Sequence, residues 1–93
     1  MSVVIVGGND CMVRQYKELC QAYDCKVKEF TQMRDGLKDR LGTPDLMVLF
    51  TSAMSHKMLR CALKEAKGNG IRITRSHSSS MEALRGILEA YAV

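Results

Sequence analysis

The chain has 93 residues, a length that allows one small domain with a core near the lower limit for independent stability. Its hydrophobic content of 46% argues against disorder, and no apolar run approaches the ~20 residues of a membrane span. The net charge of +4 suits an anionic partner, but basic and acidic residues are interleaved and aromatic residues are scarce, so we do not expect nucleic acid as a partner.

The first predicted element is a strand at residues 3–6, a continuous β-branched apolar run that ends in Gly7-Gly8. No basic leader precedes it, which favours a cytoplasmic protein whose four cysteines stay reduced. A helix should follow, with Asn9 or Asp10 as its cap, because apolar residues recur near a 3.6-residue period over residues 12–23.

The middle of the chain predicts two further strands and two helices. Residues 25–30 alternate as a charged strand, and a short helix over residues 31–41 should end at Gly42. Residues 46–50 form a second unbroken apolar strand, and the helix after it should begin at about Ser55 and end at residues 68–70.

The last strand and helix flank a run of six polar residues, Arg75-Ser76-His77-Ser78-Ser79-Ser80. Residues 71–74 alternate as a short strand. The final helix should begin at about Ser79, because Ser79 and Glu82 have the spacing of a capping box.

These elements predict an α/β fold that forms a single domain over residues 1–93. β-α repeated four times implies one open parallel four-stranded sheet in a flavodoxin- or Rossmann-like three-layer sandwich. The solid apolar runs at residues 3–6 and 46–50 are typical of central strands, and the charged runs are typical of edges. The predicted strand order is therefore 2-1-3-4.

Polar side chains follow the carboxyl ends of three predicted strands, where ligands bind in open parallel sheets. Each of these loops also starts a helix, whose first N–H groups favour anions. The candidate ligand-binding residues are Gly8, Asn9, Asp10, Thr51, Ser52, Ser55, His56, Arg75, Ser76, His77 and Ser78. We expect an anionic small molecule that carries a phosphate or carboxylate group.

Each candidate also has a purely structural interpretation. Gly7-Gly8 can make a tight turn alone, Asn9, Asp10 and Ser55 are good helix caps, and Arg75 can pair with an acid. The alternative function is a small hydrolase or transferase that uses His77 or His56 as acid or base. Cys11, as a nucleophile at a helix N-terminus, lacks the C-x5-R spacing of a phosphatase loop.

The cysteine spacing predicts no metal site. Cys20 and Cys25 are the only close pair, and burial as small hydrophobic residues explains them better than metal binding. Metal or haem binding through scattered cysteines and histidines remains an open alternative, and no cofactor is assigned. A structural or partner-binding domain is the third alternative.

Several segments together resemble a bacterial family of small stand-alone domains, DUF2325. They are residues 3–8, residues 45–51, the pair Ser55-His56 and residues 75–80. The resemblance covers nearly the whole chain and implies a small Rossmann-like domain in the bacterial cytoplasm. It assigns no catalytic residue. We also expect a homodimer or higher homo-oligomer, because a four-stranded sheet leaves exposed edges.

Overall fold

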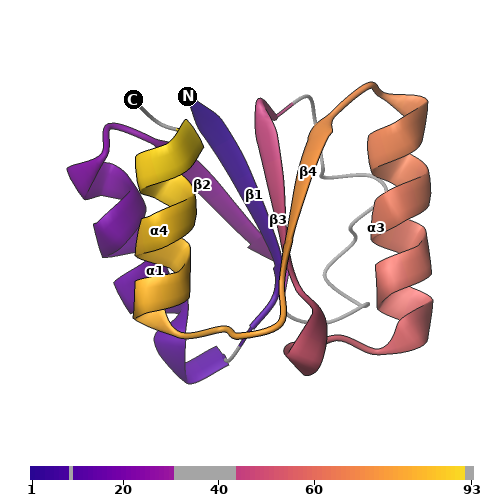
Figure 1. Cartoon of the computed structure of the whole chain (residues 1–93), viewed down its shortest axis with the longest axis horizontal. Coiled ribbons are helices and arrows are strands. Elements are labelled where there is room, and N and C mark those ends of the chain that lie inside the picture. Colours follow the sequence, from indigo (N-terminus) through magenta and orange to yellow (C-terminus); the bar gives the residue numbers. More distant parts are fainter. Residues whose placement is uncertain (9, 31–43, 92–93) are drawn as a thin grey trace.

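The computed structural model describes residues 1–8, 10–30 and 44–91, where a parallel sheet lies between helices on both of its faces (Figure 1). The strands are β1 (Ser2–Gly7), β2 (Lys26–Phe30), β3 (Leu46–Phe50) and β4 (Arg72–Ser76). The α-helices are α1 (Val13–Ala22), α3 (His56–Gly68) and α4 (Met81–Tyr91), and short 3-10 turns are η1 (Asp10–Met12) and η3 (Thr51–Ala53). All strand pairs are parallel in the order β2-β1-β3-β4, which confirms the predicted α/β fold and sheet.

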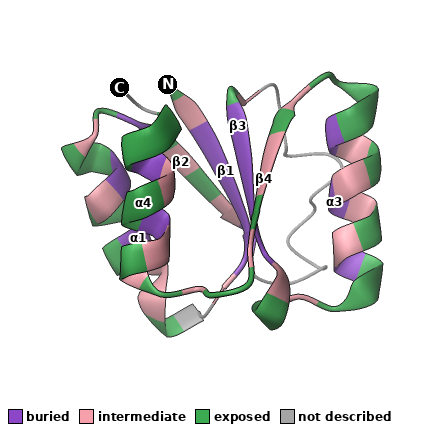
Figure 2. Cartoon of the chain, in the orientation of Figure 1, coloured by how far each residue is buried: buried purple, intermediate pink, exposed green. Residues whose placement is uncertain are grey.

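Burial explains this strand order. Every residue of β3 and all but the first of β1 are buried, whereas β2 and β4 each contain exposed positions (Figure 2). A strand covered on both faces must be apolar on both faces, so only the two solid runs can lie in the centre. The predicted helix at residues 31–41 lies outside the described residues.

The sheet separates two hydrophobic clusters. On one face α1 and α4 pack against alternate residues of β1 and β3, which include Val3, Ile5 and Phe50. On the other face α3 packs against the remaining set, which includes Val4, Val6 and Leu49 (Figure 1). No helix among the described residues is long and apolar enough to cross a membrane.

The beginning and end of α1 are set by different interactions. The N-cap of α1 itself is Met12, which makes no side-chain cap hydrogen bond, and η1 precedes it without a break. The predicted caps, Asn9 and the side chain of Asp10, lie outside the described residues. At its end the N–H of Cys25 donates to the Cys20 carbonyl at 2.9 Å, while Asp24 adopts a positive φ of 57°. These are features of a Schellman ending, which leads the chain directly into β2.

Candidate functional site

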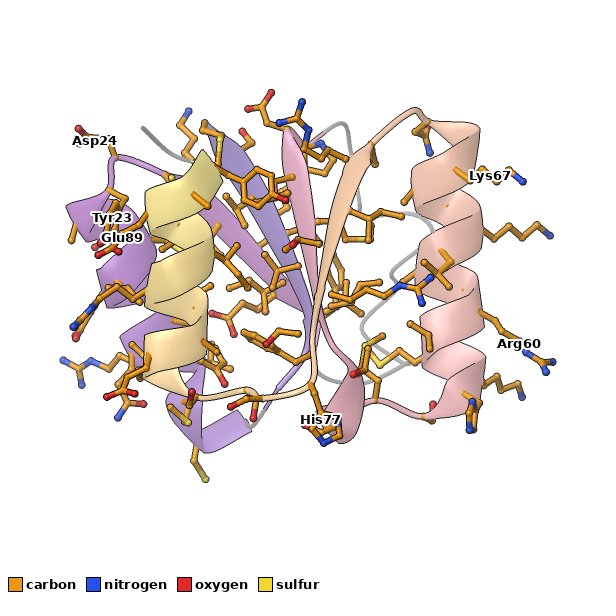
Figure 3. The ribbon with its side chains drawn as sticks, in the orientation of Figure 1. Tyr23, Asp24, Arg60, Lys67, His77 and Glu89 are labelled. Carbon is orange, nitrogen blue, oxygen red and sulfur yellow. The ribbon has the colours of Figure 1, made fainter. Side chains whose placement is uncertain are left out.

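The loops after β3 and β4 lie side by side at the carboxyl edge of the sheet. The Thr51 hydroxyl donates to the Ser76 carbonyl at 3.4 Å, which joins the start of η3 to the end of β4. Ser52 on η3 and His56 at the start of α3 are exposed. His77 is exposed on the loop after β4 and projects at the same edge of the sheet (Figure 3). These five predicted candidates, together with Ser55 and Ser78, therefore lie between β3 and the first turn of α3 or at the end of β4 and in the segment that follows it.

Ser55 has a structural role in this arrangement. Its hydroxyl accepts a hydrogen bond from the Met58 N–H at 3.1 Å, so it is the N-cap of α3, as the sequence predicts. The cap satisfies one of the N–H groups that the first turn of a helix leaves without a helical partner.

β4 extends two residues beyond its predicted end, and this separates Arg75 from Ser76. The predicted strand stops at Thr74, whereas the observed strand pairs Arg75 with Leu49 and Ser76 with Phe50. Side chains alternate between the two faces of a strand, so Arg75 lies on the α3 face and Ser76 on the α4 face. In the predicted loop both side chains could have faced one pocket. In the observed strand they point to opposite faces of the sheet.

The serine-rich segment bonds mainly to itself. Ser76 donates to the Ser78 carbonyl at 2.7 Å, and the Ser78 hydroxyl both donates to Ser80 and accepts from its N–H. The Ser80 hydroxyl accepts from the Ala83 N–H at 3.2 Å, so the cap of α4 is Ser80. The prediction of Ser79 as cap, with Glu82 in a capping box, is wrong by one residue.

The loop after β1 is filled by apolar side chains. Gly7 and Gly8 both have positive φ, at 87° and 93°. A Cβ on Gly7 would overlap Met54 and lie 2.9 Å from the Phe50 carbonyl, and one on Gly8 would lie 3.1 Å from the Tyr16 ring. The tight-turn interpretation of this pair is therefore sufficient. Asn9 and the side chain of Asp10 lie outside the described residues.

Tyr16 connects this loop to the serine-rich segment, residues 76–80. The sequence alone did not indicate this contact. Its ring is fully buried with its centroid 5.5 Å from that of Phe50, and its hydroxyl donates to the Ser79 carbonyl at 2.6 Å. The 3.6-residue period identifies Tyr16 as a core residue. Its hydrogen bond to Ser79 spans 63 positions, so no local sequence pattern indicates it.

A second chemically unusual group, Glu29, lies on β2, at the opposite side of the sheet from β4. Both carboxylate oxygens of Glu29 are shielded from solvent and have no hydrogen-bond partner in the described structure. Burial raises the pKa of this carboxyl to about 7, against the opposing effect of the Lys17 charge. Burial also raises the pKa of the Cys20 thiol to about 12, so this thiol is not a thiolate nucleophile at neutral pH. No group of three or more metal-ligating side chains occurs among the described residues.

What remains at the carboxyl edge of β3 and β4 is an exposed and basic set of side chains. Ser52, His56 and His77 are exposed there, and Arg75 is exposed on the α3 side of β4. No aspartate or glutamate occurs in residues 51–60 or 75–81. This edge can therefore attract an anion and donate hydrogen bonds to it.

Comparison with known proteins connects this chain to one family. A family model described as "uncharacterized protein conserved in bacteria (DUF2325)" matches residues 2–91, in agreement with the resemblance seen in the sequence. Neither the curated proteins nor the solved structures searched give a match.

Proposed function

We propose that this chain, which belongs to the DUF2325 family, is a small cytoplasmic domain that binds a phosphate- or carboxylate-bearing small molecule at the carboxyl edge of β3 and β4. The observation that carries the proposal is the Thr51–Ser76 hydrogen bond, which holds two loops without acidic residues against each other. His56, the first residue of α3, and His77, the residue after β4, are both exposed to an incoming ligand.

The chemistry of the edge supports an anion over a neutral ligand. α3 begins there, and its first N–H groups and dipole favour negative charge. His56 and His77 supply ring N–H donors, and Arg75 supplies a permanent charge with bidentate geometry. Ser55, Ser76 and Ser78 support the loops through their own hydrogen bonds and are not needed as ligand donors.

A second copy of the chain is also part of the proposal. β2 and β4 are the outer strands among those described, and each has backbone groups on the side that faces away from the sheet. Such edges pair readily with another strand. Light scattering after size exclusion should therefore give the mass of a dimer or higher oligomer; a monomer at high concentration would contradict this part of the proposal.

Thermal shift with inorganic phosphate, citrate and nucleoside phosphates tests the binding proposal. At a concentration of ten times Kd, a ligand stabilises the native state by about 1.4 kcal/mol. For a domain of this size that corresponds to a rise in Tm of about 6–11 °C. Turnover of a ligand found in this way would instead support the alternative of an enzyme with His77 or His56 as acid or base.

Substitutions locate the bound anion. Arg75→Gln and His77→Ala should each remove most of the ligand-induced shift. Arg72→Gln is the matched control, because Arg72 is exposed on the same strand but lies over the Tyr91 ring at 5.8 Å, on the other face of the sheet. If Arg72→Gln reduces the shift as much as Arg75→Gln does, or if no anion raises Tm, the proposed site is wrong.

A further inference from the structure

The outward face of α3 carries a stripe of positive charge. Four exposed cations, here called the α3 stripe, are Lys57, Arg60, Lys64 and Lys67. At 100° per residue they fall within an arc of about 80°, on the side of the helix opposite its buried residues. Figure 3 shows Arg60 and Lys67 pointing away from the body of the protein, and Figure 2 shows the exposed outer side of the same helix.

In the described part of the chain, no ion pair joins the α3 stripe to an acidic side chain. Glu65 is the only acidic residue of α3, and it is half-buried at the flank of the helix. The ion pair found in the described structure joins Arg14 to Glu18 on α1, on the other side of the sheet. The interleaving of charges along the sequence hides this stripe, because it becomes continuous only when the chain is wound into a helix. Interleaved charge along the sequence therefore does not disfavour nucleic acid as a partner of α3.

The residues on and around the α3 stripe exclude several classes of partner. The apolar residues of α3 pack against the sheet, so the helix has no apolar side to insert into a membrane. Protein interfaces favour aromatic anchors over lysine, and the stripe has three lysines and no aromatic residue. Single-stranded nucleic acid is held largely by stacking on aromatic rings. The exposed large hydrophobic residues among those described are Met1 and Tyr91, and neither lies on α3.

We propose that the α3 stripe binds the phosphate backbone of double-stranded nucleic acid without sequence preference. From Lys57 to Lys67 the helix rises about 15 Å, a length over which a duplex carries about nine phosphates. Lysine ammonium groups act as point charges on flexible stems, which suits a regular array of phosphates better than a ligand of fixed geometry. Arg60, Lys64 and Lys67 lie beyond the first turn of α3, so this surface is separate from the proposed small-anion site.

Fluorescence anisotropy with a short, labelled, mixed-sequence DNA duplex tests this proposal. Between about 50 and 200 mM salt, four neutralised phosphates predict a slope of log K against log salt of about −3.6. Arg60→Gln/Lys64→Gln/Lys67→Gln should reduce the slope to about −0.9 and weaken binding at the lowest salt at least about tenfold. A wild-type slope near zero would overturn the proposal.

A charge-matched control separates the stripe from net charge. Arg14→Gln/Lys26→Gln/Arg85→Gln changes the charge equally on exposed positions of α1, β2 and α4, and it should keep the wild-type slope. If this variant loses as much affinity as the stripe variant, or if poly-glutamate of equal charge displaces the duplex as well as unlabelled duplex does, the proposal fails. If the triple variant does not fold, Lys64→Glu alone replaces it in the test and should also weaken duplex binding. His77→Ala should leave duplex binding unchanged, so the two binding proposals can fail separately.

Discussion

Glu29→Gln should remove a pH dependence from the stability of this protein. The pKa of the Glu29 carboxyl is about 7 in the folded chain, against an ordinary value of 4.5, because burial disfavours its charged form. Between these two values the folded chain keeps a proton that the unfolded chain has lost. The free energy of unfolding therefore falls as pH rises from about 4.5 through about 7, and it does not fall further above that range.

The size of the effect follows from the same two values. A rise in pKa from 4.5 to about 7 on folding costs at most about 3.4 kcal/mol at pH 8. The residue as a whole is only half-buried, so solvent screening reduces the cost and we expect about 1–2 kcal/mol. Glu29→Gln should be more stable than wild type by this amount at pH 8 and nearly equal to it at pH 5, since glutamine resembles the protonated acid.

Urea denaturation from pH 5 to pH 9 measures this difference directly. The gain at pH 8 should move the midpoint by roughly 0.5–1 M urea. Lys17→Met should extend the loss of stability to higher pH and so enlarge it, because the Lys17 charge lowers the pKa of Glu29.

Glu18→Gln is the control for a carboxyl on the surface. Glu18 is exposed and pairs with Arg14 at 3.4 Å, so its loss should change stability by less than about 1 kcal/mol at any pH. Equal pH profiles for wild type and Glu29→Gln would refute the assignment of the pH dependence to Glu29.

Three further substitutions test the packing around the carboxyl edge by the midpoint of urea denaturation. Ser80→Ala should cost about 1 kcal/mol through the lost cap of α4, whereas Ser79→Ala should cost nearly nothing; the reverse order would restore Ser79 as the cap. Tyr16→Phe should cost about 0.5–1.5 kcal/mol, because the Ser79 carbonyl loses its donor, and an unchanged midpoint would show that water replaces it. Gly7→Ala should cost about 2–4 kcal/mol, because a positive φ is combined with overlap on Met54, and a neutral result would contradict the close approach.

The strand order was predictable because burial on both faces of a strand requires an apolar residue at each position. Residues 46–50 are apolar at every position only because both faces of β3 are covered, and that pattern identifies a central strand from sequence alone. The end of β4 has no such apolar pattern. Arg75 and Ser76 lie on an edge strand with partial exposure, where polar residues are as acceptable as in a loop.

The proximity of the candidate loops was also predictable, but the direction of their side chains was not. Parallel topology brings the ends of β3 and β4 to one edge, as the Thr51–Ser76 contact confirms. Which face Arg75 occupies depends on strand register, and a shift of one residue reverses it. Ser79 and Ser80 are chemically equivalent as caps, so local sequence does not distinguish them. The Tyr16 hydroxyl bonds the Ser79 carbonyl from a distant helix, and the next residue, Ser80, caps α4.

The hydrogen bonds within the serine segment have a consequence for the cost of binding. Because Ser76, Ser78 and Ser80 already fix one another, the segment that follows β4 is ordered before any ligand arrives. Ordering side chains on binding costs about 0.5–1.5 kcal/mol for each one that is immobilised, and a pre-ordered segment avoids most of that loss. Ser78→Gly should therefore weaken the binding of an anion at His77, even though Ser78 itself need not contact the ligand. The free protein would have more conformational entropy, and binding would remove it.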